Sequence, residues 1–295
     1  MAIKARVSET VSNGDAIVET YVDGRGPALV VLPSYGRDGG EDFDAFAEVV
    51  ARAGFQVLRP QPRGIGRSSG SMQVSLQDMA DDVAKVIQQL ANGGAVVLGH
   101  AFGNSVARLV ASSHGEIVKG TILAAAGSSG VSKTVNETPF IAGNLALPEE
   151  ERLAALSLAF FAPHHDARPW LTGWYPETLH MQKTAVEALN PGNSSRAGTA
   201  PTLQIPASFR RAGTAPILQI IAESDPFNPY SSWRELREQY GDRVTTRIVA
   251  DASHALFPEQ TPIAAEIVIA WLQSLGAEPH SSARCPDTNP RHLDD

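Results

Sequence analysis

Short apolar runs recur along this chain, separated by segments with helical spacing. Residues 28–32 and 95–98 are runs of aliphatic side chains, a pattern typical of strands that are buried on both faces. Between them, Met79, Val83 and Ile87 fall on one face of a helix. Strands that alternate with helices form a mostly parallel sheet with helices on both sides. The sequence therefore predicts an α/β fold.

The same two patterns extend along most of the chain. They predict further strands over 16–22, 55–58, 118–125, 216–221 and 243–249, and helices over 43–53, 76–90, 104–113, 230–240 and 262–274. The alternation lapses over 128–210, where a helix after Pro148 and a helix near 177–189 surround an aromatic stretch. We therefore divide the chain into a first part of the α/β core (1–127), an inserted helical lid (128–210), a second part of the core (211–276) and a disordered polar tail (277–295).

The composition limits the classes of function. Lys and Arg number 24 against 32 Asp and Glu, for a net charge of −8, whereas a protein that grips a phosphate backbone needs a basic face. The single cysteine, Cys285, excludes an intramolecular disulfide and a Cys-rich zinc site. The chain has no apolar run of the roughly 18 residues that a membrane helix needs, and no signal-peptide core at its start. We therefore expect a cytoplasmic protein with neither nucleic acid nor membrane as partner.

One segment is repeated. Residues 196–205 recur at 211–220 with nine of ten positions identical. Two copies are too few for a solenoid, so we expect the first copy to be a local duplication in a loop or at the edge of the lid.

The strand predicted over 95–98 passes directly into a turn flanked by glycines and then into a helix. This turn, residues 99–103, reads Gly-His-Ala-Phe-Gly and resembles the nucleophile elbow, G-x-S-x-G, of the α/β-hydrolase superfamily. In that elbow the central side chain projects from a strained turn, and the glycines let neighbouring backbone approach. The central residue is usually a serine nucleophile, whereas this chain has Ala101.

Four further segments resemble the same superfamily, and the resemblance covers about residues 15–275. The chain departs from the family pattern at Pro33, Gln61 and Ala222, where the family has histidine, aspartate and glycine. None of these departures removes a catalytic side chain, and the order along the chain is nucleophile, acid, histidine. The resemblance implies the α/β-hydrolase fold with a lid, and no cofactor. The four segments are Leu-Pro-Ser-Tyr-Gly at 32–36, Arg-Gly-Ile-Gly-Arg-Ser at 63–68, the segment 216–229 with Asp225, and the segment 252–259 with His254.

The resemblance also implies a role for each residue of the predicted site. His254 would act as base and then as acid, and Asp225 would orient it, with Glu223 as the second choice for the acid. The backbone N–H groups of Tyr35 and Phe102 would stabilise an oxyanion. The residues expected to bind substrate are Ser34, His100, Phe160, Trp170 and Trp174.

Some of these residues have a second interpretation. The aromatic residues of the lid would equally well form its core, and His100 would then be a packed neighbour of the elbow. His164 and His165 are adjacent in a polar loop, where histidines are usually solvated, so no metal site is predicted.

Ala101 itself leaves two interpretations open. One is a Ser→Ala substitution that inactivates a hydrolase. It is slightly favoured, because the elbow strains any residue with a Cβ by about 1–3 kcal/mol, and a chain freed from nucleophilic chemistry would gain from glycine or asparagine there. The other is a natural alanine, with a His254–Asp225 dyad that activates water or substrate directly.

The sequence thus predicts hydrolysis of an ester, lactone or related carbonyl compound of apolar character. A small molecule is the expected partner, and a homodimer stays open. One alternative is a natural member without the serine that uses the dyad as a cofactor-free lyase, dioxygenase or water-activating hydrolase. The other is a non-catalytic receptor for a small molecule on the same fold.

Overall fold

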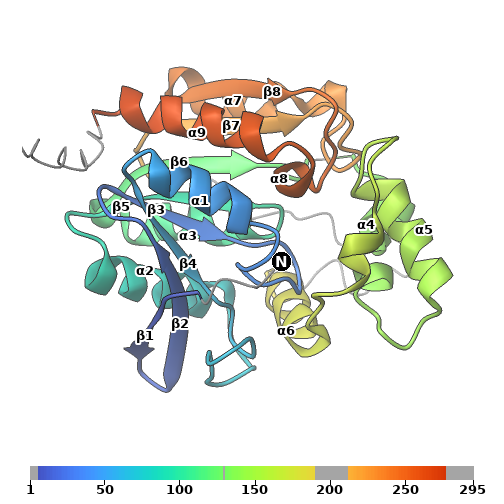
Figure 1. Ribbon diagram of the computed structural model, residues 1–295, viewed down its shortest axis with the longest axis horizontal. Helices are drawn as coiled ribbons and strands as arrows, with labels where there is room; N and C mark the ends of the chain where they lie inside the picture. The colour runs from blue at the N-terminus through green and yellow to red at the C-terminus, as the bar shows by residue number, and fades with distance from the viewer. Residues whose placement is uncertain (1–5, 129, 190–211, 277–295) are drawn as a thin grey trace, which may run out of the picture.

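The computed structural model describes residues 6–128, 130–189 and 212–276 of the chain. Its centre is a sheet in the order β1-β2-β4-β3-β5-β6-β7-β8 (Figure 1). β2 pairs antiparallel with β1 and β4, and all other neighbours pair in parallel. The predicted mostly parallel α/β sheet is therefore confirmed. The strands are β1 (Ser8–Asn13), β2 (Ala16–Asp23), β3 (Ala28–Leu32), β4 (Gln56–Pro60), β5 (Ala95–His100), β6 (Val118–Ala124), β7 (Ile217–Ala222) and β8 (Val244–Val249).

Helices cover both faces of the sheet, because its inner strands are apolar on both sides. In β3, Leu29 and Val31 pack into one core, and Val30 and Leu32 pack into the opposite core. The burial of such side chains is the main favourable contribution to folding. The first face is covered by α1 (Asp44–Arg52) and α9 (Thr261–Ser274), and the second by α2 (Leu76–Leu90) and α3 (Gly103–Ser113).

A helical insertion lies between β6 and β7, in the segment where the sequence predicts a lid. It contains α4 (Lys133–Ala142), α5 (Glu149–Ala159) and α6 (Pro176–Glu187). Figure 1 shows α4 and α5 side by side at one end of the molecule, and α6 closer to the sheet. The rest of the predicted lid (190–211, with the first copy of the repeat) and the predicted tail (277–295, with Cys285) lie outside the described residues.

Side-chain hydrogen bonds tie α6 to the core. Gln182 Oε1 accepts the backbone N–H of Gly36 at 2.7 Å. Thr178 Oγ1 donates to the carbonyl oxygen of Arg63 at 2.9 Å. The helix is thereby joined to the loops that follow β3 and β4.

Three elements differ from the sequence-based predictions for physical reasons. The strand β1 was not predicted, because it is polar apart from Val11. The helix α4 was not predicted either, since Pro139 lies inside it and proline usually breaks a helix. The helix expected over 230–240 is interrupted. Ser232 Oγ donates to the carbonyl oxygen of Pro229 at 2.7 Å, Tyr230–Ser232 form a separate 3₁₀ turn, and α7 begins only at Glu235 (Glu235–Tyr240). A last short helix, α8, spans Leu256–Glu259.

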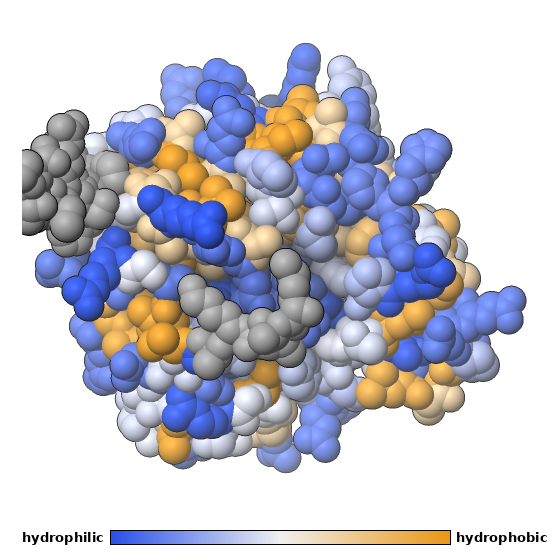
Figure 2. Space-filling model, viewed as in Figure 1, coloured by the Kyte–Doolittle hydropathy of each residue, from blue (hydrophilic) through white to orange (hydrophobic). Residues whose placement is uncertain are grey.

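Polar and charged side chains dominate the face of the molecule seen in Figure 2, with smaller apolar areas between them. In the part of the chain that the structure describes, no helix is both long and apolar enough to cross a membrane.

Candidate active site

Ala101 stands at the tight turn between β5 and α3. Its φ is 51°, a left-handed conformation that costs a residue with a Cβ about 1–3 kcal/mol. Neighbouring backbone is so close that a Cβ added at Gly99 would lie 2.3 Å from the carbonyl oxygen of Gly103. The carboxamide of Asn104 holds the turn, since its Nδ2 donates to the carbonyl oxygens of Ala101 and Ala124 at 2.9 Å each. The turn therefore has the backbone of a nucleophile elbow with a methyl group at its tip.

The loops after β7 and β8 bring an acid and a histidine together. His254 Nδ1 lies 3.0 Å from Oδ2 of Asp225, and the exposed fractions of the two side chains are 6% and 0%. The N–H of Phe227 donates to the Asp225 carboxylate at 2.9 Å, and the rings of Phe227 and Phe160 pack on the imidazole at centroid distances of 4.2 and 5.3 Å. These contacts hold Nδ1 toward the carboxylate and leave Nε2 for a substrate. Glu223 is exposed.

His100 holds the backbone of the loop that carries His254 through a hydrogen bond. Its Nε2 lies 2.7 Å from the backbone carbonyl oxygen of His254, and because a carbonyl only accepts, Nε2 must carry the proton and donate it. Burial, and then the neighbouring His254, lower the pKa of His100 to about 4, so the ring is neutral at pH 7. It also packs edge-on against Phe43 and Phe257.

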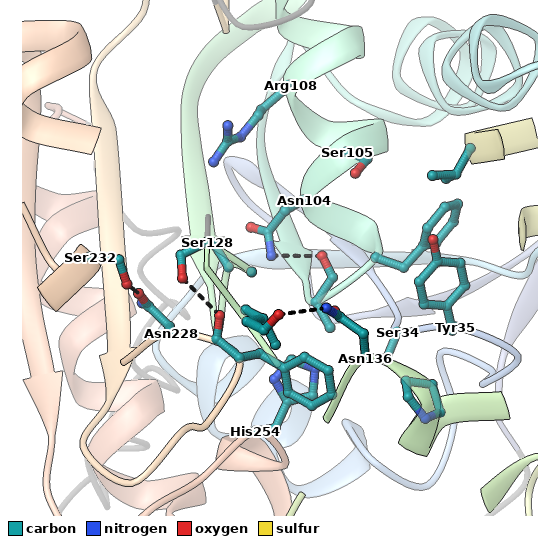
Figure 3. A pocket seen from close by; sticks show the side chains of 18 of the residues that line it. Ser34, Tyr35, Asn104, Ser105, Arg108, Ser128, Asn136, Asn228, Ser232 and His254 are labelled. Carbon is teal, nitrogen blue, oxygen red and sulfur yellow. Dashed lines mark hydrogen bonds between the residues drawn. The ribbon is translucent and has the colours of Figure 1, made fainter. Parts of the chain in front are cut away.

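A cavity of about 410 Å³ opens between the elbow and the histidine loop (Figure 3). This volume is typical of a small-molecule site. Five of the residues predicted for the site line it, namely Ser34, Tyr35, Ala101, Phe102 and His254. Asp225 is joined to this group through its hydrogen bond with His254.

The structure does not bring the other predicted substrate-binding residues to this cavity. Phe160, Trp170 and Trp174 belong to a buried aromatic cluster within the insertion and, with His100, are absent from the described cavity wall. Arg37 Cζ lies 4.4 Å from the centroid of the Trp170 ring, so a cation occupies a ring face that was expected to meet substrate. The aromatic composition of a segment does not reveal which face its rings present, which is why sequence reasoning left this open.

The expected oxyanion donors are next to each other. Tyr35 and Phe102 both line the cavity, and their rings pack at a centroid distance of 4.4 Å. Neither backbone N–H donates a hydrogen bond within the described residues, so both are available to an oxyanion. The bond from Gly36 to Gln182 of α6 fixes the turn that carries Tyr35.

The cavity wall also contains polar residues that the sequence analysis did not single out. Beside the apolar surface of Tyr35, Phe102 and Phe140, the wall has a polar side along α3. One feature of the sequence could have indicated this polar side. Asn104 and Arg108 are four residues apart, which places them on one face of the helix after the elbow. The buried polar residues of this side are Asn104, Ser105, Arg108, Gln219, Asn228 and Ser232.

Comparison with known proteins agrees with the fold. Residues 27–261 match the family model described as alpha/beta hydrolase fold, and the chain therefore belongs to the α/β-hydrolase family of enzymes. None of the curated proteins matches it.

Many solved structures are similar to this chain. An esterase from Exiguobacterium antarcticum is 16% identical with a TM-score of 0.71, over 90% of this chain and 100% of that chain. A meta-cleavage product hydrolase from Pseudomonas fluorescens, a serine-to-alanine mutant complexed with acetates, is 16% identical with a TM-score of 0.70, over 90% and 97%. A thermophilic esterase from Thermogutta terrifontis is 18% identical with a TM-score of 0.65, over 92% and 99%. At such identities the likeness shows the fold alone.

Proposed function

We propose that this chain hydrolyses an ester-type carbonyl compound in the cavity between Ala101 and His254, with His254 as the general base that activates water. The buried His254–Asp225 pair at the cavity carries this proposal, because a neutral imidazole held by a carboxylate is the base that such a hydrolysis needs. Ala101 has no group that attacks a carbonyl, so water makes the attack in this chain.

Each proton and charge has a place in this mechanism. With Nδ1–H donating to Asp225, Nε2 of His254 takes a proton from water while the water oxygen attacks the carbonyl carbon. The N–H groups of Tyr35 and Phe102 stabilise the negative charge on the carbonyl oxygen. The imidazolium then returns the proton to the leaving alkoxide. The products are a carboxylic acid and an alcohol, and no acyl-enzyme forms.

A second candidate is that Ala101 replaces the serine of an ordinary triad hydrolase. The elbow favours this candidate, because Ala101 keeps a φ of 51° in a turn whose use in this family is to present a nucleophile. Loss of the nucleophile from a triad costs about 10⁶ in turnover, so the alanine chain would bind esters and turn them over very slowly.

Two substitutions separate these candidates, with hydrolysis of p-nitrophenyl acetate as the readout. If water attacks, the unsubstituted chain exceeds the uncatalysed rate by about 10³–10⁴, His254→Ala removes this activity, and Ala101→Ser changes it less than tenfold. If a serine is missing, Ala101→Ser raises turnover by about 10³ or more. The matched control is His114→Ala, which removes a histidine paired with Asp81 at 2.7 Å but absent from the cavity wall.

Other results would contradict both candidates. A chain that binds esters but hydrolyses none, even as Ala101→Ser, is a small-molecule receptor. Products of elimination or of oxygen incorporation would identify a lyase or a dioxygenase that uses the same dyad.

A further inference from the structure

Glu259 is an acidic side chain near His254 to which the proposed mechanism gives no role. It is the last residue of α8, and its Oε2 accepts the backbone N–H of Ser253 at 2.7 Å. Residues 252–257 are all buried, and a buried N–H needs a partner. Because Ser253 directly precedes His254, Glu259 holds the backbone from which the imidazole projects.

The other carboxylate oxygen of Glu259 binds the insertion. Its Oε1 accepts the backbone N–H of Ala162 at 2.6 Å. Two residues earlier, the carbonyl oxygen of Phe160 accepts the N–H of Ala255 at 2.7 Å, and the ring of Phe160 packs on the imidazole of His254. Glu259 therefore joins the loop that carries His254 to the segment of the insertion that contacts the imidazole.

A carboxylate suits this position because both of its oxygens accept hydrogen bonds. A carboxamide would accept at one oxygen only, and its NH₂ group would face the second N–H. Burial raises the pKa of Glu259 above its ordinary value, against the lowering by the two N–H groups. Two other charged residues that act on it, Asp251 and His165, are paired with each other at 3.3 Å. An acid with a perturbed pKa near a cavity is a candidate for a functional role.

We propose that Glu259 is a positioning residue for His254, whose carboxylate fastens the loop that carries His254 to the insertion and so keeps Nε2 at the cavity. Asp225 orients the ring, and Glu259 fixes the backbone that carries it. This role rests on the proposed function, in which His254 is the general base. A reacting group displaced by about 1 Å can cost about 100-fold in rate, so a bond to the neighbouring backbone affects turnover.

Proton NMR of the unsubstituted chain tests the proposal without any turnover. The Nδ1–H of His254, which donates to Asp225, is identified by its loss in His254→Ala, and its exchange with water reports local opening of the loop. The backbone N–H of Leu98, buried in the middle of β5, reports global unfolding. Relative to Leu98, the Nδ1–H should exchange about 10- to 100-fold faster in Glu259→Gln, because a hydrogen bond to a charged group is lost.

Turnover of p-nitrophenyl acetate gives a second measurement. Glu259→Gln should lower kcat about 10- to 100-fold and change KM less than about twofold, since Glu259 is absent from the described cavity wall. Glu259→Asp, which keeps the charge but is one methylene shorter, should give intermediate values and serves if Glu259→Gln does not fold.

Two control variants remove acids that hold no backbone beside His254. Glu266 is exposed on α9, and Asp251 is 65% exposed and pairs with His165. Because exposed charges contribute little, Glu266→Gln and Asp251→Asn should change the exchange ratio and kcat less than about twofold.

The proposal is overturned if the exchange ratio in Glu259→Gln equals that of the unsubstituted chain, or if Asp251→Asn raises it as much. A Glu259→Gln chain that is less stable but keeps the exchange ratio and kcat would assign Glu259 to the fold alone. Absence of ester hydrolysis in every chain would contradict the proposed function, and the exchange ratio would still decide whether Glu259 positions His254.

Discussion

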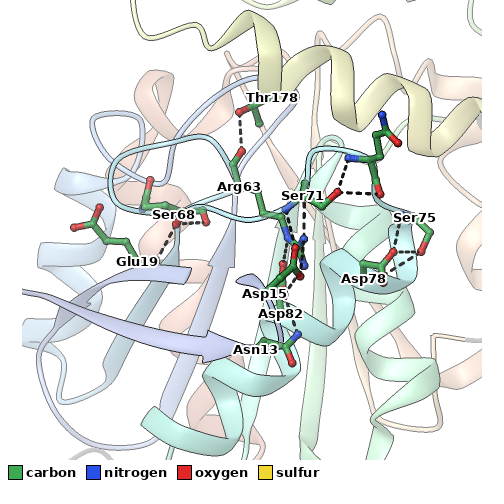
Figure 4. A network of polar contacts seen from close by, with 12 residues as sticks. Asn13, Asp15, Glu19, Arg63, Ser68, Ser71, Ser75, Asp78, Asp82 and Thr178 are labelled. Atoms are coloured by element: carbon green, nitrogen blue, oxygen red, sulfur yellow. Dashed lines mark hydrogen bonds and ion pairs between the residues drawn. The ribbon is translucent and has the colours of Figure 1, made fainter. Parts of the chain in front are cut away.

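Arg63–Asp82 and His254–Asp225 are both buried acid–base pairs, yet their surroundings differ. Arg63 Nε lies 2.7 Å from Asp82, with side-chain exposures of 6% and 8%, and Asn13 Nδ2 donates to the same carboxylate at 2.9 Å. Figure 4 shows this pair inside a network of polar contacts between the β1–β2 turn and α2. His254–Asp225 is as buried, but its histidine lines a cavity.

The two pairs differ in whether the basic side chain is always charged. The hydrogen bonds that Arg63 donates to Asp82 raise the pKa of Arg63 above its ordinary value, and a guanidinium stays charged in either case. An imidazole can be neutral at pH 7 and become charged when it takes a proton. A pair with a permanent charge therefore suits the fold alone, whereas a pair with a titratable base at a cavity is suited to proton transfer, the role proposed for His254–Asp225.

The largest expected change in stability comes from removing the acid of each pair in turn. Asp82→Ala should lower the free energy of unfolding by about 3–5 kcal/mol, because it leaves the buried, charged Arg63 with only the exposed Asp15, at 3.9 Å, as an acidic partner. Asp225→Ala should cost only about 1–3 kcal/mol, because the remaining histidine can stay neutral. Urea unfolding measures both. The control is Asp81→Ala in α2, whose side chain is 41% exposed and whose removal should cost less than that of Asp82. Equal losses of unfolding free energy in Asp82→Ala and Asp225→Ala would contradict the comparison.

A smaller effect concerns a buried histidine with no carboxylate partner. The pKa of His100 is about 4 in the folded chain, against about 6.5 for an unfolded histidine. The unfolded state therefore takes up a proton first as the pH falls, and stability is lost below about pH 6.5, by about 2 kcal/mol at pH 5. The loss between pH 7.5 and pH 5 should shrink by that amount in His100→Gln. The exposed His180 supplies the control, His180→Gln, and an identical pH dependence in all three chains would refute the prediction.

The smallest effect concerns the strain at the elbow. Ala101→Gly should raise the free energy of unfolding by about 1 kcal/mol, since glycine adopts a φ of 51° without a Cβ clash. Ala270→Gly, at an exposed position inside α9, should lower it by about 1 kcal/mol. Thermal and urea unfolding of the two variants give the signs. A destabilised Ala101→Gly would mean that the turn is not strained.

The parts of the molecule that depend on local patterns could be predicted from the sequence. The run Ala28–Leu32 is buried along its whole length, as five aliphatic residues in a row indicate. The order of elbow, acid and histidine was also informative, because parallel strands that all end at one edge of a sheet bring Asp225 and His254 into contact.

The parts that depend on tertiary packing could not be predicted. Phe160 and Trp170 are apolar enough to line a pocket or a core, and only tertiary packing decides between them: Phe160 packs on Trp170, and Arg37 covers the Trp170 ring. Arg108 looks like an ordinary surface charge on a helix. It is buried because the wall formed by α3, β7 and the insertion encloses its face of the helix.

The hydrogen bonds of α6 have a consequence for engineering the substrate range. α6 contributes Lys183 and Val186 to the cavity, but its Gln182 also holds the backbone beside Tyr35. The helix α4 contributes Asn136 and Phe140 and packs mainly on α5. Because Phe140 packs on the Tyr35 ring at a centroid distance of 5.7 Å, mutant libraries at Asn136 of α4 reshape the cavity without disturbing Tyr35, a proposed oxyanion donor, whereas libraries at Phe140 or on α6 also disturb the backbone or ring of Tyr35.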